Sequence, residues 1–270
     1  MNKKVEHILR HHIKEWNLTP DGDRFQTHSS LLQPVLYEDL ECMLKISLTP
    51  EEKRGGKLLE WWNGKGVANV LKSDEDAILM EKIVSDYSLK SMSLNGKDDC
   101  STRIICKVAN LLHSCNKKSL PELIPLNIWF KDLFLSADRY GSLFLKAGEI
   151  AASVLENQTD LTVLHGDLHH DNILFSSTKG WVAIDPKGLF GDKAFDYVNI
   201  LCNPTKEIAL SEGRLMKQIK IISQNSGVNI NHILKWTIAW AALSAVWLLN
   251  DDIEASLPTG ILEIAIAKYM

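Results

Sequence analysis

The sequence lacks any run of about 20 apolar residues, the length that a helix needs to cross a bilayer. Its longest weakly polar stretch, residues 236–249, is shorter than this, so we expect no membrane-spanning segment. Residues 1–16 carry charges every few positions and have neither an apolar region nor a small-residue cleavage site. They therefore predict an amphipathic helix rather than a secretory signal.

Cysteine is scarce, with five residues that are widely spaced and form no C-x-x-C pair. This pattern excludes a disulfide framework and a zinc ribbon, and it favours the reducing cytoplasm. Only 15 Gly and 8 Pro occur among 270 residues, of which 45% are hydrophobic and 24% are charged. This composition excludes disordered, collagenous and fibrous proteins and is typical of a globular protein.

Long basic blocks are also missing, and the net charge is −4. We therefore expect no nucleic-acid surface and no membrane association, and nothing in the pattern implies a protein partner. A slightly acidic protein is compatible with cationic small ligands.

The chain length predicts one large fold with two lobes. Short apolar runs at 29–39, 41–47, 67–71 and 77–81 indicate antiparallel strands, with a helix at 51–62 between the second and third. After residue 83 helical spacing dominates, interrupted by strands at 161–164, 172–175 and 181–185. The predicted class is α+β, with an N-terminal lobe at 1–83 containing a small sheet and one helix, and a larger, mainly helical C-terminal lobe at 84–270.

Three tryptophans near the C-terminus follow helical spacing. Trp236, Trp240 and Trp247 lie with Leu243 on one predicted helix face. A face packed into the core is the favoured interpretation, over a set of rings that stack on a ligand.

The segment 164–175, LHGDLHHDNILF, carries the strongest chemical signal. His165, Asp167 and Asn172 have the spacing H-x-D-x-x-x-x-N of a kinase catalytic loop, and Asp185 ends the next predicted strand. In such loops the aspartate accepts the proton of the substrate hydroxyl, and the asparagine holds magnesium. The segment therefore predicts phosphoryl transfer, with Asn172 and Asp185 supplying the oxygen ligands that Mg²⁺ prefers.

A zinc site is the alternative for the same segment, because His165, His169 and His170 lie near Asp167 and Asp171. Adjacent histidines point in different directions, and no Cys or H-E-x-x-H pattern joins them. Magnesium is therefore favoured over zinc.

A kinase also needs a lysine on a strand to contact the nucleotide phosphates, and an acidic residue to orient that lysine. Lys45 is the lysine on a strand-like run of the N-terminal lobe, and Glu51 or Glu52 opens the following helix. We expect replacement of Lys45 to affect catalysis more than folding, since a surface lysine contributes little stability.

These motifs, together with EEKRGGKLLEWWNGKGVANVL (51–71) and GWVAIDPKGLFGDKAFD (180–196), resemble the streptomycin 6-kinase and hydroxyurea phosphotransferase family. This family lies within the aminoglycoside phosphotransferase superfamily, and the resemblance covers residues 21–252. It implies the bilobal protein-kinase-like fold, with ATP bound under the first lobe.

The resemblance also implies roles for individual residues. Asp167 would be the catalytic base, Asn172 and Asp185 the magnesium ligands, and Lys45 the phosphate contact, with Glu52 favoured over Glu51 as its partner. The adenine-binding hinge would comprise Met80, Glu81, Lys82 and Ile83. Asp196 would be structural, an N-cap or a loop brace, with a substrate contact as the alternative.

Two departures from protein kinases stand out. No glycine-rich loop occurs, so the turn His28-Ser29-Ser30 would hold phosphate through amides and the hydroxyls of Ser29 and Ser30. The triplet Asp185-Pro186-Lys187 replaces Asp-Phe-Gly and predicts constitutive activity.

The expected function is an ATP- and Mg²⁺-dependent kinase that phosphorylates a small antibiotic, most specifically the 6-hydroxyl of streptomycin, and so confers resistance. The guanidinium groups of streptomycin suit carboxylate receptors, and the candidate receptors are Asp192, Asp251, Asp252 and Glu254. The alternatives are a kinase of hydroxyurea or of another small-molecule hydroxyl, and a catalytically silent nucleotide-binding relative.

Overall fold

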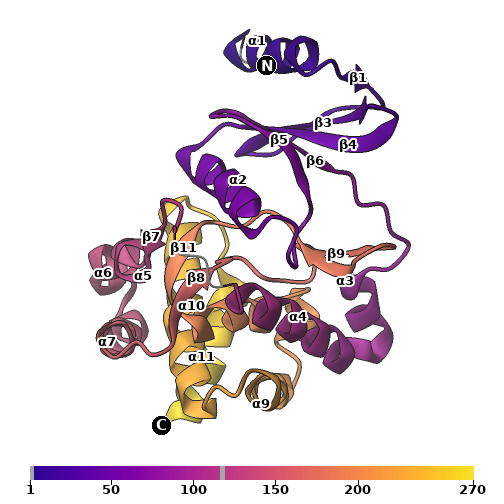
Figure 1. Ribbon diagram of the computed structural model, residues 1–270. Helices are drawn as coiled ribbons and strands as arrows, with labels where there is room; N and C mark the ends of the chain where they lie inside the picture. The colour runs from indigo at the N-terminus through magenta and orange to yellow at the C-terminus, as the bar shows by residue number, and fades with distance from the viewer. Residues whose placement is uncertain (1–2, 116–118) are drawn as a thin grey trace.

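The computed structural model describes residues 3–115 and 119–270 as a sheet-containing lobe stacked on a larger helical lobe (Figure 1). The first lobe contains α1 (Lys3–Glu15), β1 (Thr19–Pro20), β2 (Phe25–Gln26), β3 (Ser30–Tyr37), β4 (Leu40–Ser47), α2 (Pro50–Trp62), β5 (Val70–Ser73) and β6 (Ala77–Glu81). Its antiparallel sheet has the order β1-β3-β4-β6-β5, and β2 pairs with β3. The predicted amphipathic helix, the intervening helix and the strands at 29–39, 41–47 and 77–81 are therefore confirmed, whereas the strand predicted at 67–71 lies later, at Val70–Ser73.

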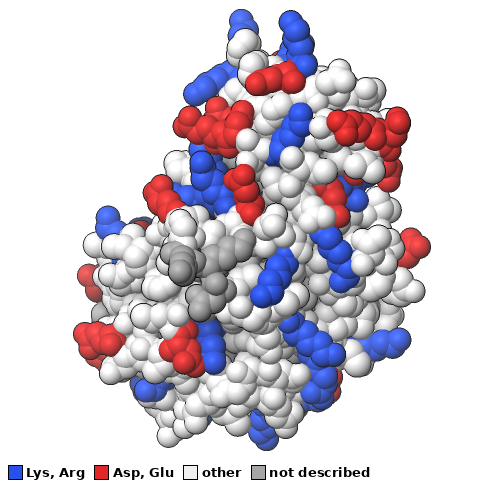
Figure 2. All heavy atoms as spheres, in the orientation of Figure 1, with Lys and Arg blue, Asp and Glu red and all other residues white. Residues whose placement is uncertain are grey.

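The larger lobe follows after residues 82–88. It comprises α3 (Leu89–Met92), η1 (Ser93–Lys97), α4 (Asp98–His113), β7 (Ile124–Pro125), α5 (Leu126–Trp129), α6 (Lys131–Ser136), η2 (Ala137–Tyr140), α7 (Ser142–Glu156), β8 (Leu161–Leu164), β9 (Ile173–Ser176), β10 (Gly180–Ala183), β11 (Leu189–Asp192), η3 (Lys193–Cys202), α8 (Lys206–Ala209), α9 (Arg214–Ser226), α10 (Ile230–Asn250) and α11 (Ser256–Tyr269). Charged side chains of both signs are scattered over the face shown in Figure 2. The division of the chain at residue 83 stays a prediction.

The hairpin β3–β4 determines where Lys45 lies. Glu38 and Asp39 form its two-residue turn with φ values of 50° and 64°, as the tightest hairpin connections require. The resulting register pairs Leu32 with Lys45, and on the other side β6 pairs Ile78 with Lys45. Lys45 is therefore held in the middle of the sheet and is 7% exposed.

Helix α2 begins with a sequence-encoded cap. The side chain of Thr49 accepts a hydrogen bond from the Glu52 amide at 3.3 Å, and Pro50 occupies the first turn. The first glycine in the helix, Gly55, faces the chain after β10, where a Cβ atom would overlap the carbonyl oxygen of Pro186. Glycine at this position therefore lets α2 pack directly on the segment that carries Asp185.

The predicted catalytic segment, residues 164–175, connects two small sheets. Strand β8 leads into residues 165–172, after which β9 and β10 form the predicted hairpin. Strand β11 then returns antiparallel to β8, pairing Leu189 with Leu164. Strands β8 and β9 thus hold the two ends of the loop. The 3₁₀ helix η3 directly follows β11.

The main hydrophobic core crosses from one lobe to the other. Leu58, Leu59 and Trp62 of α2 belong to the same buried cluster as the helices of the larger lobe. A second cluster packs α1 on the outer face of the sheet. The inner face of the small lobe is therefore continuous with the core below it.

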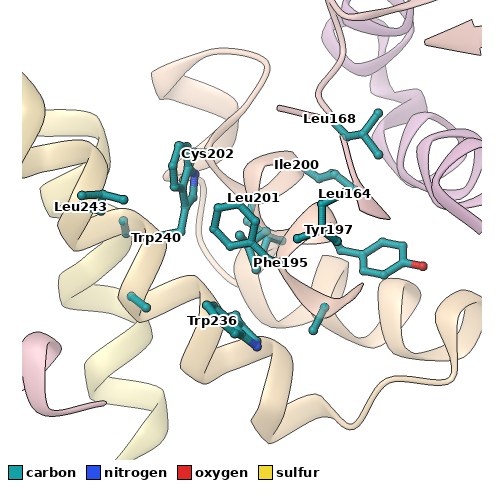
Figure 3. Close-up of a cluster of buried hydrophobic side chains, with 14 of the residues drawn as sticks. Leu164, Leu168, Phe195, Tyr197, Ile200, Leu201, Cys202, Trp236, Trp240 and Leu243 are labelled. Carbon is teal, nitrogen blue, oxygen red and sulfur yellow. The ribbon is translucent and has the colours of Figure 1, made fainter. Parts of the chain in front are cut away.

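Helix α10 forms the centre of the larger lobe, where Trp236 and Trp240 pack around Phe195 (Figure 3). It extends over 21 residues, longer than the weakly polar stretch in the sequence indicates, and its length and composition would suffice to cross a membrane. However, 67% of its most apolar window is buried within the protein, as in a core helix.

Candidate active site

Asp167 lies at the centre of the catalytic segment, with both carboxylate oxygens engaged. Its Oδ2 accepts a hydrogen bond from Asn172 Nδ2 at 3.0 Å, and its Oδ1 accepts one from Asn199 Nδ2 at 2.7 Å. Its side chain is 24% exposed. Burial raises the pKa of Asp167 to about 7, and the positive charge of Lys187 opposes this rise. The carboxylate is thus oriented by amides yet open on one side.

Asp196 holds the backbone that precedes Asp167. Its two carboxylate oxygens accept hydrogen bonds from the amides of His165 at 3.0 Å and Gly166 at 2.7 Å, and His113 contacts it at 2.8 Å. The predicted structural brace is therefore confirmed. These charge-assisted hydrogen bonds hold the backbone of His165 and Gly166 in place.

Lys45 joins the two lobes through carboxylates. Its ammonium group forms ion pairs with Glu52 from α2 and with Asp185 from the larger lobe. Lys187 lies 3.4 Å from Glu52 and 3.2 Å from Asp185, so two ammonium groups face two carboxylates. Burial alone would raise the pKa of Asp185, but the charges of Lys45 and Lys187 hold it well below its usual range.

A cavity of about 230 Å³ lies beneath the sheet, beside this ion-pair cluster. Asn172 and Asp185 line it together with Lys45, Ser29 and Ser30. Among the described residues, the buried Oγ of Ser30 has no hydrogen-bond partner, and Ser29 Oγ donates to Glu52 at 3.0 Å. The cavity therefore combines an ammonium group, which suits phosphate, with two oxygen ligands, which suit a hard cation such as Mg²⁺.

The structure places the predicted hinge residues at the end of β6. Of the four, Met80 lines the cavity. The backbone amides of Glu81 and Lys82 donate to the carbonyls of Asn69 and Glu41 inside the small lobe. Adenine contacts by residues 80–83 stay a prediction.

A second, larger cleft of about 630 Å³ is lined by Asp167, which accepts a hydrogen bond from Asn172 of the first cavity. It is lined by acidic and aromatic side chains from both lobes: Glu51, Asp132, Asp167, Asp251, Trp129, Trp240 and Trp247, with His28, Ile124, Ile128, Gly166 and Lys187. The indole of Trp247 donates to Asp132 at 2.9 Å. This cleft therefore offers carboxylates and rings, which together bind organic cations.

The four acidic residues predicted to contact substrate separate in the structure. Asp251 lines the cleft, whereas its neighbour Asp252 does not. Glu254 lies 3.4 Å from Lys206 on the exterior. Asp192 is 1% exposed, caps η3 through the Ala194 amide and contacts His232 at 2.7 Å, so its carboxylate is committed within the protein. This placement does not fit a substrate contact by Asp192.

The tryptophan-rich face of α10 contacts two environments, the hydrophobic core and the acidic cleft. Trp236 and Leu243 are fully buried in the core, as predicted. Trp240 is buried in the same core and Trp247 packs against it, so the core interpretation is confirmed, while both rings also line the acidic cleft. Their indole N–H groups carry the polar contacts that a purely apolar face would not need.

Several cleft and loop residues were not expected from the sequence. Lys187 directly follows Asp185-Pro186, and its position in this triplet could have indicated that it lies beside Asp185. Asp132 follows Trp129 by three residues, a spacing that brings side chains to one face of a helical segment. Asn199 had no signal, because it reaches Asp167 from η3 through tertiary packing.

The zinc alternative receives no support. His169 faces Asp167 at 3.8 Å, whereas His170 turns toward Asp98 at 3.9 Å. Among the residues that the structure describes, no three His, Cys, Asp or Glu side chains could hold a metal ion together.

Comparisons with known proteins bear on the family and the fold of this chain. Residues 15–252 match the family model for aminoglycoside/hydroxyurea antibiotic resistance kinases. The chain is 38% identical to streptomycin 3''-kinase from Klebsiella pneumoniae, over 88% of this chain and 91% of the relative. It is 26% identical to streptomycin 6-kinase from Streptomyces griseus, over 96% of this chain and 86% of the relative.

Among solved structures, a thermostable mutant of aminoglycoside phosphotransferase APH(4)-Ia, in a ternary complex with AMP-PNP and hygromycin B, superposes with a TM-score of 0.72. The match covers 98% of this chain and 99% of that one at 11% identity, so it bears on the fold alone. The predicted bilobal protein-kinase-like fold is thereby confirmed. With the family model covering most of its length, the chain belongs to the aminoglycoside/hydroxyurea antibiotic resistance kinases.

Proposed function

We propose that this protein is an ATP- and Mg²⁺-dependent kinase that phosphorylates a hydroxyl of streptomycin in the cytoplasm and thereby confers resistance. The observation that carries the proposal is that Asp167 connects two sites. Asp167 lines the acidic, tryptophan-lined cleft, and it accepts a hydrogen bond from Asn172, which lines the cavity together with Lys45 and Asp185. A phosphoryl donor and a cationic acceptor could therefore meet at this carboxylate.

In the proposed reaction, the acceptor hydroxyl donates a hydrogen bond to Asp167, which takes its proton as the oxygen attacks the γ-phosphorus. The bond between the γ-phosphorus and the β,γ-bridging oxygen breaks, and ADP leaves. Asn172 and Asp185 would hold Mg²⁺, which neutralises charge on the phosphates. Lys45 orients the phosphates and is itself aligned by Glu52.

The acceptor class follows from the cleft lining. Streptomycin carries guanidinium groups, which pair with carboxylates through two hydrogen bonds and stack on indole faces. Glu51, Asp132 and Asp251 supply the carboxylates, and Trp129 and Trp247 supply the rings. Hydroxyurea is uncharged and far smaller than this cleft of about 630 Å³, so streptomycin is favoured.

The phosphorylated position is the finer question. From the sequence we expect the 6-hydroxyl, but the chain is 38% identical to the 3''-kinase, compared with 26% to the 6-kinase. Both relatives are covered over most of their length, so this difference favours the 3''-hydroxyl. We therefore propose the 3'' position, with the 6 position as the alternative.

The test is a coupled assay for ADP release with streptomycin, with hydroxyurea, and without acceptor. We expect streptomycin-dependent turnover that requires Mg²⁺. A phosphorus–proton NMR correlation of the product then assigns the phosphate to C3'' or C6. Turnover with hydroxyurea alone would refute the acceptor, whereas phosphate at C6 would refute only the position.

A further inference from the structure

Asn199 links Asp167 to the acidic, tryptophan-lined cleft, which is called the acceptor cleft below. It lies on η3, three residues after Asp196. A 3₁₀ helix has about three residues per turn, so residues three apart project from the same face. Asp196 therefore holds the backbone of the catalytic loop, and Asn199 reaches the side chain of Asp167 beside it.

The surroundings of Asn199 fix which end of its amide faces Asp167. Its Oδ1 accepts hydrogen bonds from Trp240 Nε1 at 3.2 Å and from Asn203 Nδ2 at 3.2 Å. Its Nδ2 is then directed at Asp167 Oδ1, at 2.7 Å. The reversed amide would set an NH₂ group against two donors and an oxygen against a carboxylate.

The side-chain type follows from the same contacts. An indole N–H can only donate, and an ionised carboxylate can only accept. A neutral group between them must accept on one side and donate on the other, which a primary amide does with fixed geometry. Aspartate at this position would lose the donor, and leucine would lose both functions.

We infer that Asn199 is a positioning residue, which with Asn172 holds the Asp167 carboxylate so that its remaining lone pairs face the acceptor hydroxyl. An ionised carboxylate has about four lone-pair sites, of which the two amides occupy two. Trp240 lines the acceptor cleft and donates a hydrogen bond to Asn199. Asn199 therefore connects the wall of the cleft to the Asp167 carboxylate. This inference rests on the proposed function of Asp167.

The test compares Asn199→Asp, which keeps the shape but removes the donor, with Asn199→Gln, which keeps the amide. The matched control is Asn110→Asp, because Asn110 also contacts η3, through Tyr197 at 2.6 Å, and its other contact is the Asn225 carbonyl. We measure kcat, the KM values for MgATP and streptomycin, and the melting temperature. The slow hydrolysis of ATP by water is measured without acceptor.

For Asn199→Asp we expect kcat to fall by roughly 10- to 100-fold, as for other residues that orient a reactive group from behind. Both KM values should stay near wild type, and Asn199→Gln should recover part of the loss. Asn110→Asp should keep its kcat even where its melting temperature falls. A wild-type kcat in Asn199→Asp, or an equal loss in Asn110→Asp, would overturn the inference.

If Asn199→Asp does not fold, Trp240→Phe decides, because it retains an aromatic ring in the core and removes the N–H that orients the amide, together with part of the indole. Its rate of ATP hydrolysis should fall, and an unchanged rate would overturn the inference. The hydrolysis assay also separates the two proposals. A wild type that ignores streptomycin refutes the proposed acceptor, while the effect of Asn199→Asp on hydrolysis still tests the positioning role.

Discussion

The ammonium group of Lys187 lies 3.2 Å from the carboxylate of Asp185, two residues earlier in the chain. Asp185 has a φ of 61°, a left-handed conformation that is uncommon for residues other than glycine. Its side chain also pairs with Lys45, so lysines from both lobes neutralise one carboxylate. The proposed phosphate site therefore contains balanced charges before any nucleotide enters.

Replacing Lys45 should impair both catalysis and stability. The expectation that it behaves as a surface lysine is wrong, because it is 7% exposed. Lys45→Met should lower kcat/KM by about 100-fold or more, as for the loss of an electrostatic stabiliser. The stability loss should stay below the roughly 3–5 kcal/mol of a broken buried pair, because Lys187 still faces Glu52.

The measurements are urea unfolding and steady-state kinetics, with Lys57→Met on exposed α2 surface as the control. Full activity in Lys45→Met would contradict the assigned phosphate contact.

Asp167 and Asp185 should have separable effects. Asp167→Asn keeps the shape but removes the accepting charge, so turnover should fall by roughly 10²–10⁴ while MgATP affinity survives. Asp185→Asn removes a hard anionic ligand and should weaken MgATP binding together with turnover. Calorimetric titration with MgATP and the coupled assay distinguish the two. Wild-type turnover by Asp167→Asn would eliminate it as the base.

Asp251 and Asp252 provide a matched pair for testing the acceptor cleft. Asp251 lines the cleft, and Asp252 adopts a φ of 57° that asparagine tolerates well. Asp251→Asn should raise the KM for streptomycin by roughly tenfold, because a hydrogen bond to a charged group contributes about 1.5 kcal/mol or more. Asp252→Asn should leave it unchanged, and neither should alter the KM for MgATP. Equal KM values in both variants would exclude a contact by Asp251.

His170 should make stability depend on pH. Burial lowers its pKa from 6.5 to about 4, and the nearby Arg214 charge acts in the same direction. Between these two values the unfolded chain binds the proton and the folded protein does not, so stability falls as pH drops from 6.5 toward 4. From pH 7 to pH 5 this group alone should remove about 2 kcal/mol.

His170→Leu should therefore lose about 2 kcal/mol less than wild type over that range, measured by urea unfolding at both pH values. Both ring nitrogens of His170 lack hydrogen-bond partners among the described residues, so leucine leaves no new polar group unpaired. The same substitution at exposed His7 controls for removal of an imidazole. An identical pH dependence in His170→Leu and wild type would contradict this assignment.

The parts of the site that the sequence predicts are those encoded over short distances. The eight-residue spacing from His165 to Asn172 and the hairpin after it are local, and Lys45 was identifiable because it lies on a strand-like run. The helix predicted at 51–62 begins at Pro50 in the structure, capped by Thr49, and this places Glu52 in its first turn. Local capping and alternation thus account for most of the small lobe.

The rest depends on packing between distant segments. Asp132 and Trp247 meet across 115 residues, and Asn199 contacts Asp167 across 32. A helix face rich in tryptophan predicts burial, but it does not reveal that one edge of the face borders a cleft. Asp192 illustrates the reverse case, since an acidic residue in a polar motif is 1% exposed and bonds to the Ala194 amide and to His232.

The close approach of Gly55 to Pro186 bears on how resistance can be controlled. Helix α2 is seated on the larger lobe with no Cβ atom between them, and its leucines are part of that lobe's core. Swinging this helix outward, the means by which many kinases are silenced, would expose a continuous apolar surface. We therefore expect an enzyme without an inactive conformation. The cell would then control the amount of phosphorylation through the synthesis and degradation of the protein.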